Sequence, residues 1–240
     1  TLMRLMEPPA RTVAVSADGR RLAVAGGGVE PGAVHLLRRE GAAGEGLWAR
    51  EAVLRAGDAA GGDGTDRMGA DRSGTGAGSD AAPEGFGAAL AVAGDRVLVG
   101  APEAGPGGAA WLFEVVGDRW APVARVVPDS TEADGRLGAA VALAGDEALI
   151  GAPGRDRVVR LVRDADGSWA RAGELRPAIG STGGPQGLGF GAALALDGAR
   201  LLVGAPGAEG GKGAVHRRIR RNGAWEAEEE HLSDPGQEGS

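Results

Sequence analysis

Several residue types that build common sites are missing or scarce in this 240-residue chain. It has no cysteine and no tyrosine, only three histidines, and aromatic residues make up 3%. The absence of cysteine excludes disulfides, a thiol nucleophile and cysteine-ligated metals, and three histidines give little basis for a zinc site. No apolar run approaches the roughly 18 residues that a membrane span requires, so we expect no membrane span.

Positive charge is also limited, because 33 acidic residues outnumber 26 basic ones and give a net charge of −7. This balance argues against nucleic acid as the main partner. Lys212 is the only lysine, so arginine supplies nearly all the positive charge. Arginines gather at 155–163 and 217–221. These runs fit a solvated outer face, and the alternative is an anion-binding or docking patch.

What the chain does have is a repeated phrase. The segment 86–102 begins with Phe-Gly and ends with Gly-Ala-Pro, and it recurs at 137–153 and 190–206. Residues 12–26 carry a degenerate first copy. Self-similarity with a period of about 50 residues is typical of a propeller or a solenoid.

Each copy contains four strand-like runs separated by glycine-rich turns. In the second copy the runs are 88–93, 96–101, 109–115 and 120–127. The connection between the first two is so short that only a hairpin fits. The 46 glycines and 13 prolines interrupt any long helix. The pattern therefore predicts an all-β β-propeller built of four-stranded antiparallel blades.

The repeat also predicts the domain organisation. We expect one propeller array with blade 1 at 10–56, a low-complexity insertion at 57–84, blade 2 at 85–127, blade 3 at 137–176, blade 4 at 189–232, and the start of a further linker at 233–240. Stacked repeats leave exposed edges unless they close or are capped. Four blades are therefore expected to belong to a larger propeller of about seven blades, with further blades of the same parent chain as partners.

The phrases at 86–102 and 190–206 resemble the FG-GAP repeats of bacterial proteins and of the integrin α-subunit propeller. The resemblance implies a secreted or cell-surface protein in which the propeller is a non-enzymatic binding or scaffold module. Two alternatives are a structural spacer in a large envelope protein and a propeller enzyme whose site lies outside this chain. Integrin-type repeats can carry calcium loops between their first two strands, but the turns here are too short to surround a cation.

A binding surface is expected on the loops at one rim, where recognition commonly takes place. The candidate residues for a protein or glycan ligand are Glu103, Arg155, Asp156, Glu209 and Lys212, with Asp129, Glu132 and Asp134 from a linker. The first strand of each blade carries small apolar residues where a channel-lining strand of an enzyme would carry acid–base groups. This composition argues against an enzyme.

One calcium site is a further possibility. Residues 61–69 match the Gly-Gly-x-Gly-x-Asp-x-apolar-x nonapeptide of calcium-binding β-rolls, although in a single copy. The candidate ligands in this insertion and in the next linker are Asp63, Asp66, Asp129, Glu132 and Asp134. The alternative is a low-complexity linker in which the aspartates form Asx-turns. No other cofactor is expected.

Overall fold

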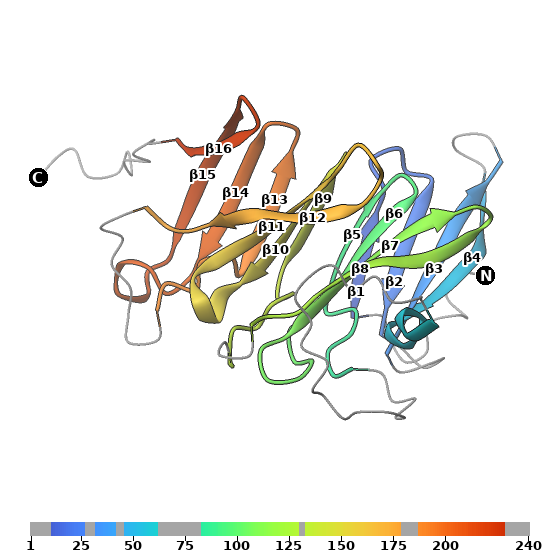
Figure 1. Cartoon of the computed structure of the whole chain (residues 1–240), viewed down its shortest axis with the longest axis horizontal. Coiled ribbons are helices and arrows are strands. Elements are labelled where there is room, and N and C mark those ends of the chain that lie inside the picture. The colour runs from blue at the N-terminus through green and yellow to red at the C-terminus, as the bar shows by residue number, and fades with distance from the viewer. Residues whose placement is uncertain are drawn as a thin grey trace, which may run out of the picture.

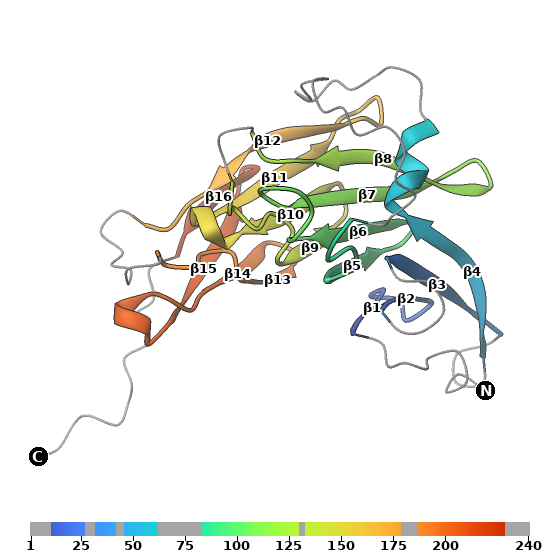
Figure 2. The ribbon, with the colours of Figure 1, turned by 90° about the horizontal axis from the view of Figure 1, so that it is seen from below.

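The computed structural model describes residues 11–26, 32–41, 46–61, 83–129, 133–178 and 187–228. In these residues the chain forms four sheets that stand side by side along an open row (Figure 1). Viewed from below, the row bends so that the first and last sheets do not meet (Figure 2). No helix within the described ranges is long and apolar enough to cross a membrane.

Every sheet contains four antiparallel strands in chain order. Blades 1 and 2 consist of β1 (Thr12–Val15), β2 (Arg21–Ala25), β3 (Ala33–Glu40), β4 (Leu47–Arg55), β5 (Ala89–Ala93), β6 (Arg96–Ala101), β7 (Ala109–Val116) and β8 (Arg119–Val126). Blades 3 and 4 consist of β9 (Val141–Ala144), β10 (Glu147–Ala152), β11 (Arg157–Arg163), β12 (Trp169–Leu175), β13 (Ala193–Asp197), β14 (Arg200–Ala205), β15 (Ala214–Arg221) and β16 (Ala224–Ala227). The predicted all-β fold with four-stranded antiparallel blades is confirmed.

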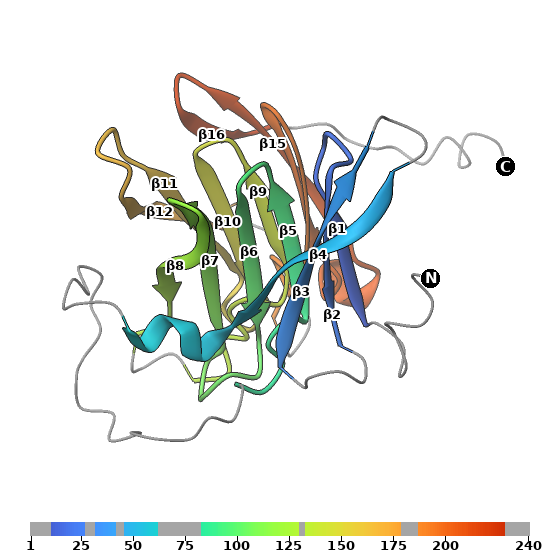
Figure 3. The same ribbon diagram turned by 90° about the vertical axis from the view of Figure 1, so that its right-hand side faces the viewer.

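Short 3-10 helices interrupt the loops at η2 (Ala56–Gly61), η3 (Pro153–Arg155) and η4 (Glu209–Gly211). The first of these follows β4 and lies beside blade 2 (Figure 3). Tight turns join the first two strands of each blade; Ala93 pairs with Arg96 across the β5–β6 turn. Gly94 in that turn has a φ of 56°, which glycine adopts without the steric cost of a Cβ.

The hydrophobic core lies between blades. In β6, the consecutive residues Val97, Leu98 and Val99 are all fully buried. The two valines belong to the apolar cluster shared with blade 1, whereas Leu98 belongs to the cluster shared with blade 3. A strand buried on both faces reads as a continuous apolar run, which explains the Val-Leu-Val sequence.

The repeated phrase encodes the contact between blades at one end of the sheets. Gly138 donates a backbone hydrogen bond to Gly151 of its own blade at 2.9 Å and lies against Gly100 of the preceding blade. Its φ of 91° and the lack of space for a Cβ both require glycine. The Phe-Gly or Leu-Gly pair before each first strand, at 86–87, 137–138 and 190–191, is called the docking pair below.

Arginines join the blades at the opposite end. Arg96 donates to Glu114 of its own blade at 2.8 Å and to the carbonyl of Gly145 in the next blade at 2.5 Å. Its guanidinium carbon lies 5.6 Å from the ring centroid of Trp169, also in the next blade. The Trp169 Nε1–H in turn donates to Glu114 at 2.9 Å. This arrangement is called the arginine clasp.

A similar clasp, without the hydrogen bond from the indole, joins blade 1 to blade 2. Arg21 pairs with Glu51 at 2.9 Å, donates to the carbonyl of Gly94 at 2.7 Å and lies 5.4 Å from the Trp120 ring centroid. In blade 3 the charges are exchanged, because the buried Glu147 replaces the arginine. Arg160 and Arg220 pair with this carboxylate and Trp225 donates to it.

Candidate functional site

The predicted rim residues lie at one end of the blades, which we call the loop rim. It consists of the described loops that join second and third strands, together with the described parts of the inter-blade linkers, on the lower side of Figure 1. Glu103 follows β6, Arg155 ends η3, Asp156 caps it, and Glu209 and Lys212 belong to the η4 loop. These residues share a rim but not a single site, since each loop belongs to a different blade.

Polar groups gather where blades 2 and 3 meet. Arg155 Nη2 donates to the carbonyl of Ala133 at 2.6 Å, so the arginine lies across the linker that leads into blade 3. Asp134 is held in that linker by its N–H, which donates to the carbonyl of Pro106 at 2.7 Å. Arg136 follows two residues later and is exposed. We call Asp134, Arg136 and Arg155 the junction site.

The backbone of the junction site is unusual. Asp134 and Arg136 have φ values of 64° and 53°. Residues other than glycine rarely adopt this left-handed conformation, which costs about 1–3 kcal/mol and is concentrated at functional sites. Its side chains are one carboxylate and two guanidinium groups, and guanidinium groups are suited to binding anionic groups.

Asp156 has a structural role. Its carboxylate accepts hydrogen bonds from the backbone N–H groups of Leu188 at 3.1 Å and Phe190 at 2.9 Å. These bonds fix the docking pair of blade 4 on blade 3. Two of the carboxylate's acceptor positions are thereby occupied, so Asp156 is a poor choice for a ligand-binding residue.

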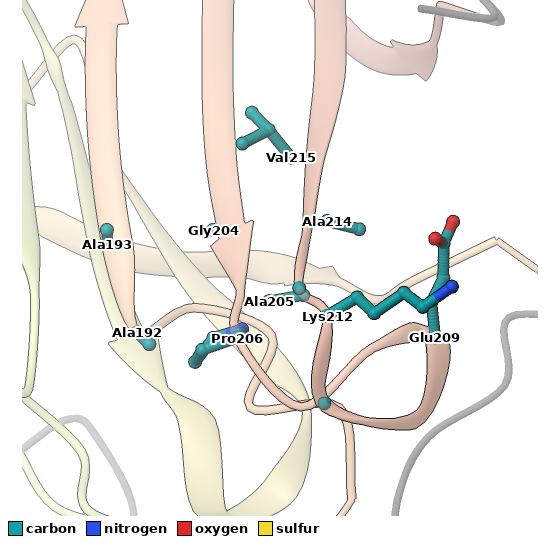
Figure 4. Close-up of a pocket in the computed structure, with 11 residues that line it drawn as sticks. Ala192, Ala193, Gly204, Ala205, Pro206, Glu209, Lys212, Ala214 and Val215 are labelled. Atoms are coloured by element: carbon teal, nitrogen blue, oxygen red, sulfur yellow. The ribbon is translucent and has the colours of Figure 1, made fainter. Parts of the chain in front are cut away.

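Glu209 and Lys212 border a cavity of about 860 Å³ on the outer face of blade 4. Both side chains rise from the η4 loop at one edge of this cavity, and its floor consists of small residues of β13 and β14 (Figure 4). Glu103 lies apart from it, beside Gly85 at the start of blade 2. The predicted binding residues are thus distributed over three loops.

The structure tests little of the calcium prediction. Asp63, Asp66 and Glu132 lie outside the described residues. Asp129 and Asp134 lie within them, and the described part of the chain contains no group of three or more acidic or histidine side chains that could hold a metal ion. Calcium binding by the insertion stays a prediction.

The arginine runs are mostly engaged in ion pairs. Arg157 is buried and pairs with Glu174 at 3.0 Å, and Arg163 pairs with Glu114 at 3.3 Å. The sequence analysis missed this role. For the arginine clasps, which were also missed, a signal was available, because arginine begins the second strand at Arg21, Arg96 and Arg200 in the same repeat position.

His216 packs between blades 3 and 4. Its ring lies 5.1 Å from the Phe190 ring, edge to face. Burial, and then the neighbouring charge of Arg218, lower the pKa of His216 below its usual value of 6.5. The imidazole is therefore a packing group at a blade junction.

Comparison with known proteins identifies the type of fold. No protein-family model and no curated protein matches this sequence. Among solved structures, a protein from Lactobacillus plantarum is similar with a TM-score of 0.52 and 14% identity over 92% of this chain and 57% of its own. A candidate 6-phosphogluconolactonase from Bacteroides fragilis has a TM-score of 0.51 and 12% identity over 91% of this chain and 53% of its own. The chain thus spans little more than half the length of these proteins.

These findings correct the family expectation. The predicted FG-GAP membership is wrong, since no family model matches and the similar structures include a candidate lactonase. The physical reason is that the Phe-Gly and Gly-Ala-Pro phrases encode the close approach of Gly138 to Gly100. Close packing of blades imposes this requirement, so the phrases report the architecture rather than a family.

The prediction of a non-enzymatic binding or scaffold module is also wrong, as is the integrin-like assignment. The argument against an enzyme considered only the apolar first strands. Polar groups also lie outside those strands, on the loop rim at Asp134 and Arg155. A secreted or cell-surface location stays a prediction. The similarity to solved structures, at these identities, establishes an all-β propeller-type fold.

Proposed function

We propose that this chain belongs to a lactone-hydrolysing propeller and that its junction site binds an anionic sugar-acid lactone. The observation that carries the proposal is the position of Asp134 and the exposed Arg136, both in left-handed conformations on the linker into blade 3, with the exposed Arg155 bound to the same linker at Ala133. The similarity in fold to a candidate 6-phosphogluconolactonase supports the choice of substrate class.

The junction site has the groups that lactone hydrolysis uses. Water adds to the ring carbonyl, and the tetrahedral oxyanion then collapses with cleavage of the ring C–O bond. The Asp134 carboxylate accepts the proton of the attacking water and returns it to the leaving alkoxide, as a general base and then a general acid. Arg136 and Arg155 stabilise the oxyanion and the anionic substituent through charge-assisted hydrogen bonds.

The test is hydrolysis of 6-phosphogluconolactone and of uncharged gluconolactone, each followed against the spontaneous rate. Asp134→Asn and Arg155→Ala are expected to lower kcat/KM at least tenfold, the usual range for one acid–base or oxyanion group. Arg119→Ala, at an exposed position in the β7–β8 hairpin at the other end of blade 2, is the control and should keep full activity. Hydrolysis no faster than in buffer, or unaffected by both junction variants, would refute the proposal.

A further inference from the structure

The outer face of blade 4 lacks the cover that equivalent faces have. Leu98 in blade 2 and Leu149 in blade 3 face the following blade and are fully buried. Leu202 occupies the same strand position in blade 4 and is 43% exposed. Val215, on the neighbouring strand, is 59% exposed. The face therefore presents the apolar residues of a blade junction without a partner among the described residues.

The cavity on this face corresponds to the slot that holds a docking pair elsewhere. In blades 2 and 3, Gly100 and Gly151 lie directly against Gly138 and Gly191 of the next blade. Gly204 is their counterpart, and the three heavy atoms nearest to a Cβ at this position belong to Ala193 of its own blade. The cavity of about 860 Å³ begins at Gly204 and extends to the η4 loop (Figure 4).

The clasp position of blade 4 is also open. Arg200 begins β14 just as Arg21 and Arg96 begin β2 and β6, and it is exposed. Each of those two arginines binds the carbonyl and the carboxylate in the first hairpin turn of the next blade. Arg200 thus offers a positive charge where the next turn would bring a carboxylate.

We propose that this face is the docking site for one further blade of the same construction. Its large apolar–glycine docking pair enters the cavity at Gly204, and its first hairpin turn binds Arg200 through a carbonyl and an acidic side chain. The proposal rests on continuity with the existing blade junctions: the glycine contact recurs after blades 2 and 3, and the arginine contact with the next hairpin turn recurs after blades 1 and 2. It is independent of any catalytic activity.

A second copy of this chain does not supply the required segment. In blade 1, Arg11 donates to the carbonyl of Ala25, as Gly87 donates to Gly100 in blade 2. Arg11 thus stands where the docking pairs have glycine, and the slot has no room for a Cβ there, as Gly138 shows. The occupant is therefore a blade that carries glycine at this position.

The experiment extends the full chain by appending, after Ser240, a copy of residues 187–228 in which Ala199 is replaced by Asp, so that its first turn carries the acidic side chain found at Asp95 and Asp146. The segment between the blades then has about the length of the one between blades 3 and 4. Because the chain contains no cysteine, Val215→Cys provides a unique thiol on the face. We expect it to react with a thiol reagent at least tenfold more slowly in the extended chain than in the parent chain. Val116→Cys, at a position 55% exposed on blade 2, is the matched control and should react equally fast in both.

A second variant tests the slot itself. Gly204→Val in the original blade 4 of the extended chain should restore fast labelling at position 215, because the added side chain fills the site of the docking pair. Fast labelling in the extended chain without this substitution overturns the proposal. Slow labelling that Gly204→Val leaves unchanged also overturns it, because docking would not use the slot. If the thiol already reacts slowly in the parent chain, and the parent chain has twice the monomer mass in solution, the face is covered by a second copy and the proposal is overturned.

Discussion

Substitutions at three glycines in equivalent strand positions can show whether the contact between blades, or the strand backbone itself, requires glycine. Gly100, Gly151 and Gly204 all have ordinary negative-φ backbones, so alanine introduces no dihedral strain. At the first two positions a Cβ would point at the backbone of the next blade. We expect Gly100→Ala and Gly151→Ala to lower the free energy of unfolding by about 2–3 kcal/mol, as overpacking does.

Gly204→Ala is the internal control, because its nearest neighbour is only the Ala193 methyl group. We expect a change within about 0.5 kcal/mol, since alanine also reduces the entropy of the unfolded chain. Urea unfolding of the three variants measures the difference. An equal loss at all three positions would show that the strand, and not the junction, requires glycine.

His216 makes the stability of the junction between blades 3 and 4 depend on pH. Burial lowers its pKa in the folded chain below the unfolded value of 6.5, so the unfolded chain takes up the proton first on acidification. Its contribution to stability is therefore complete above about pH 6.5 and declines as the pH falls toward the lower folded pKa.

The variant His216→Trp removes this titration and copies the Phe86–Trp111 pair of blade 2, whose ring centroids are 5.3 Å apart. We expect the free energy of unfolding of the variant, relative to the parent chain, to rise as the pH is lowered from 7 to 5. Urea unfolding across this pH range gives the comparison. A pH-independent difference would mean that His216 has the same pKa in both states.

At the scale of strands, the arginine clasp holds one blade to the next. Glu114 is 7% exposed and accepts from both Arg96 and Trp169. Its removal leaves a partly buried guanidinium and an indole N–H without their acceptor. We expect Glu114→Ala to cost about 3 kcal/mol, the usual range for breaking a buried ion pair.

The control for Glu114 is an ion pair on the surface. Glu226 lies 3.5 Å from Arg221, and both side chains are exposed. Glu226→Ala should cost less than about 0.5 kcal/mol and even less at high salt. Thermal unfolding at two salt concentrations distinguishes the two pairs. Similar costs for both would show that the clasp adds little to the junction.

Local sequence predicted the hairpins well, because their turns contain glycine and aspartate, which strongly favour tight turns. The two-residue turn at Gly94-Asp95 fixes the register of β5 on β6, and the predicted strands of blade 2 begin and end within one residue of the observed ones. The contacts between blades were harder to predict from the sequence. Glu147 stands where Arg21 and Arg96 stand in their blades, and only the fold brings Arg220 to it from 73 residues away.

The junction site was only partly predictable for the same reason. Arg155 and Asp134 were both singled out as rim residues, and Asp134 also as a calcium ligand, but their proximity was not predicted. Their proximity depends on how the linker of blade 3 folds back over η3, where the Gly154 N–H donates to the carbonyl of Gly135 at 3.1 Å. The left-handed conformation of Arg136 has no local signal, because arginine has no preference for it.

For the whole molecule, the number of junctions that a blade makes should determine its stability. Blades 2 and 3 are packed on both faces, whereas blades 1 and 4 expose Val13 and Val215 on their outer faces. In stacked repeats, stability is approximately a sum of repeat and nearest-neighbour terms. The terminal blades should therefore open locally at a lower free energy than the central ones.

Native-state hydrogen exchange tests this gradient on two strands with matched pairing. β6 and β14 are both second strands, each hydrogen-bonded on both sides within its blade. We expect the amides of β6 to exchange at least tenfold more slowly than those of β14, because β6 lies between two packed faces and β14 beside an open one. Equal protection would require the outer face of blade 4 to be covered in solution or the four blades to open as one unit. If protection is equal and does not change with protein concentration, a second copy does not cover this face. The four blades would then open as one unit, and nearest-neighbour packing would not control local stability.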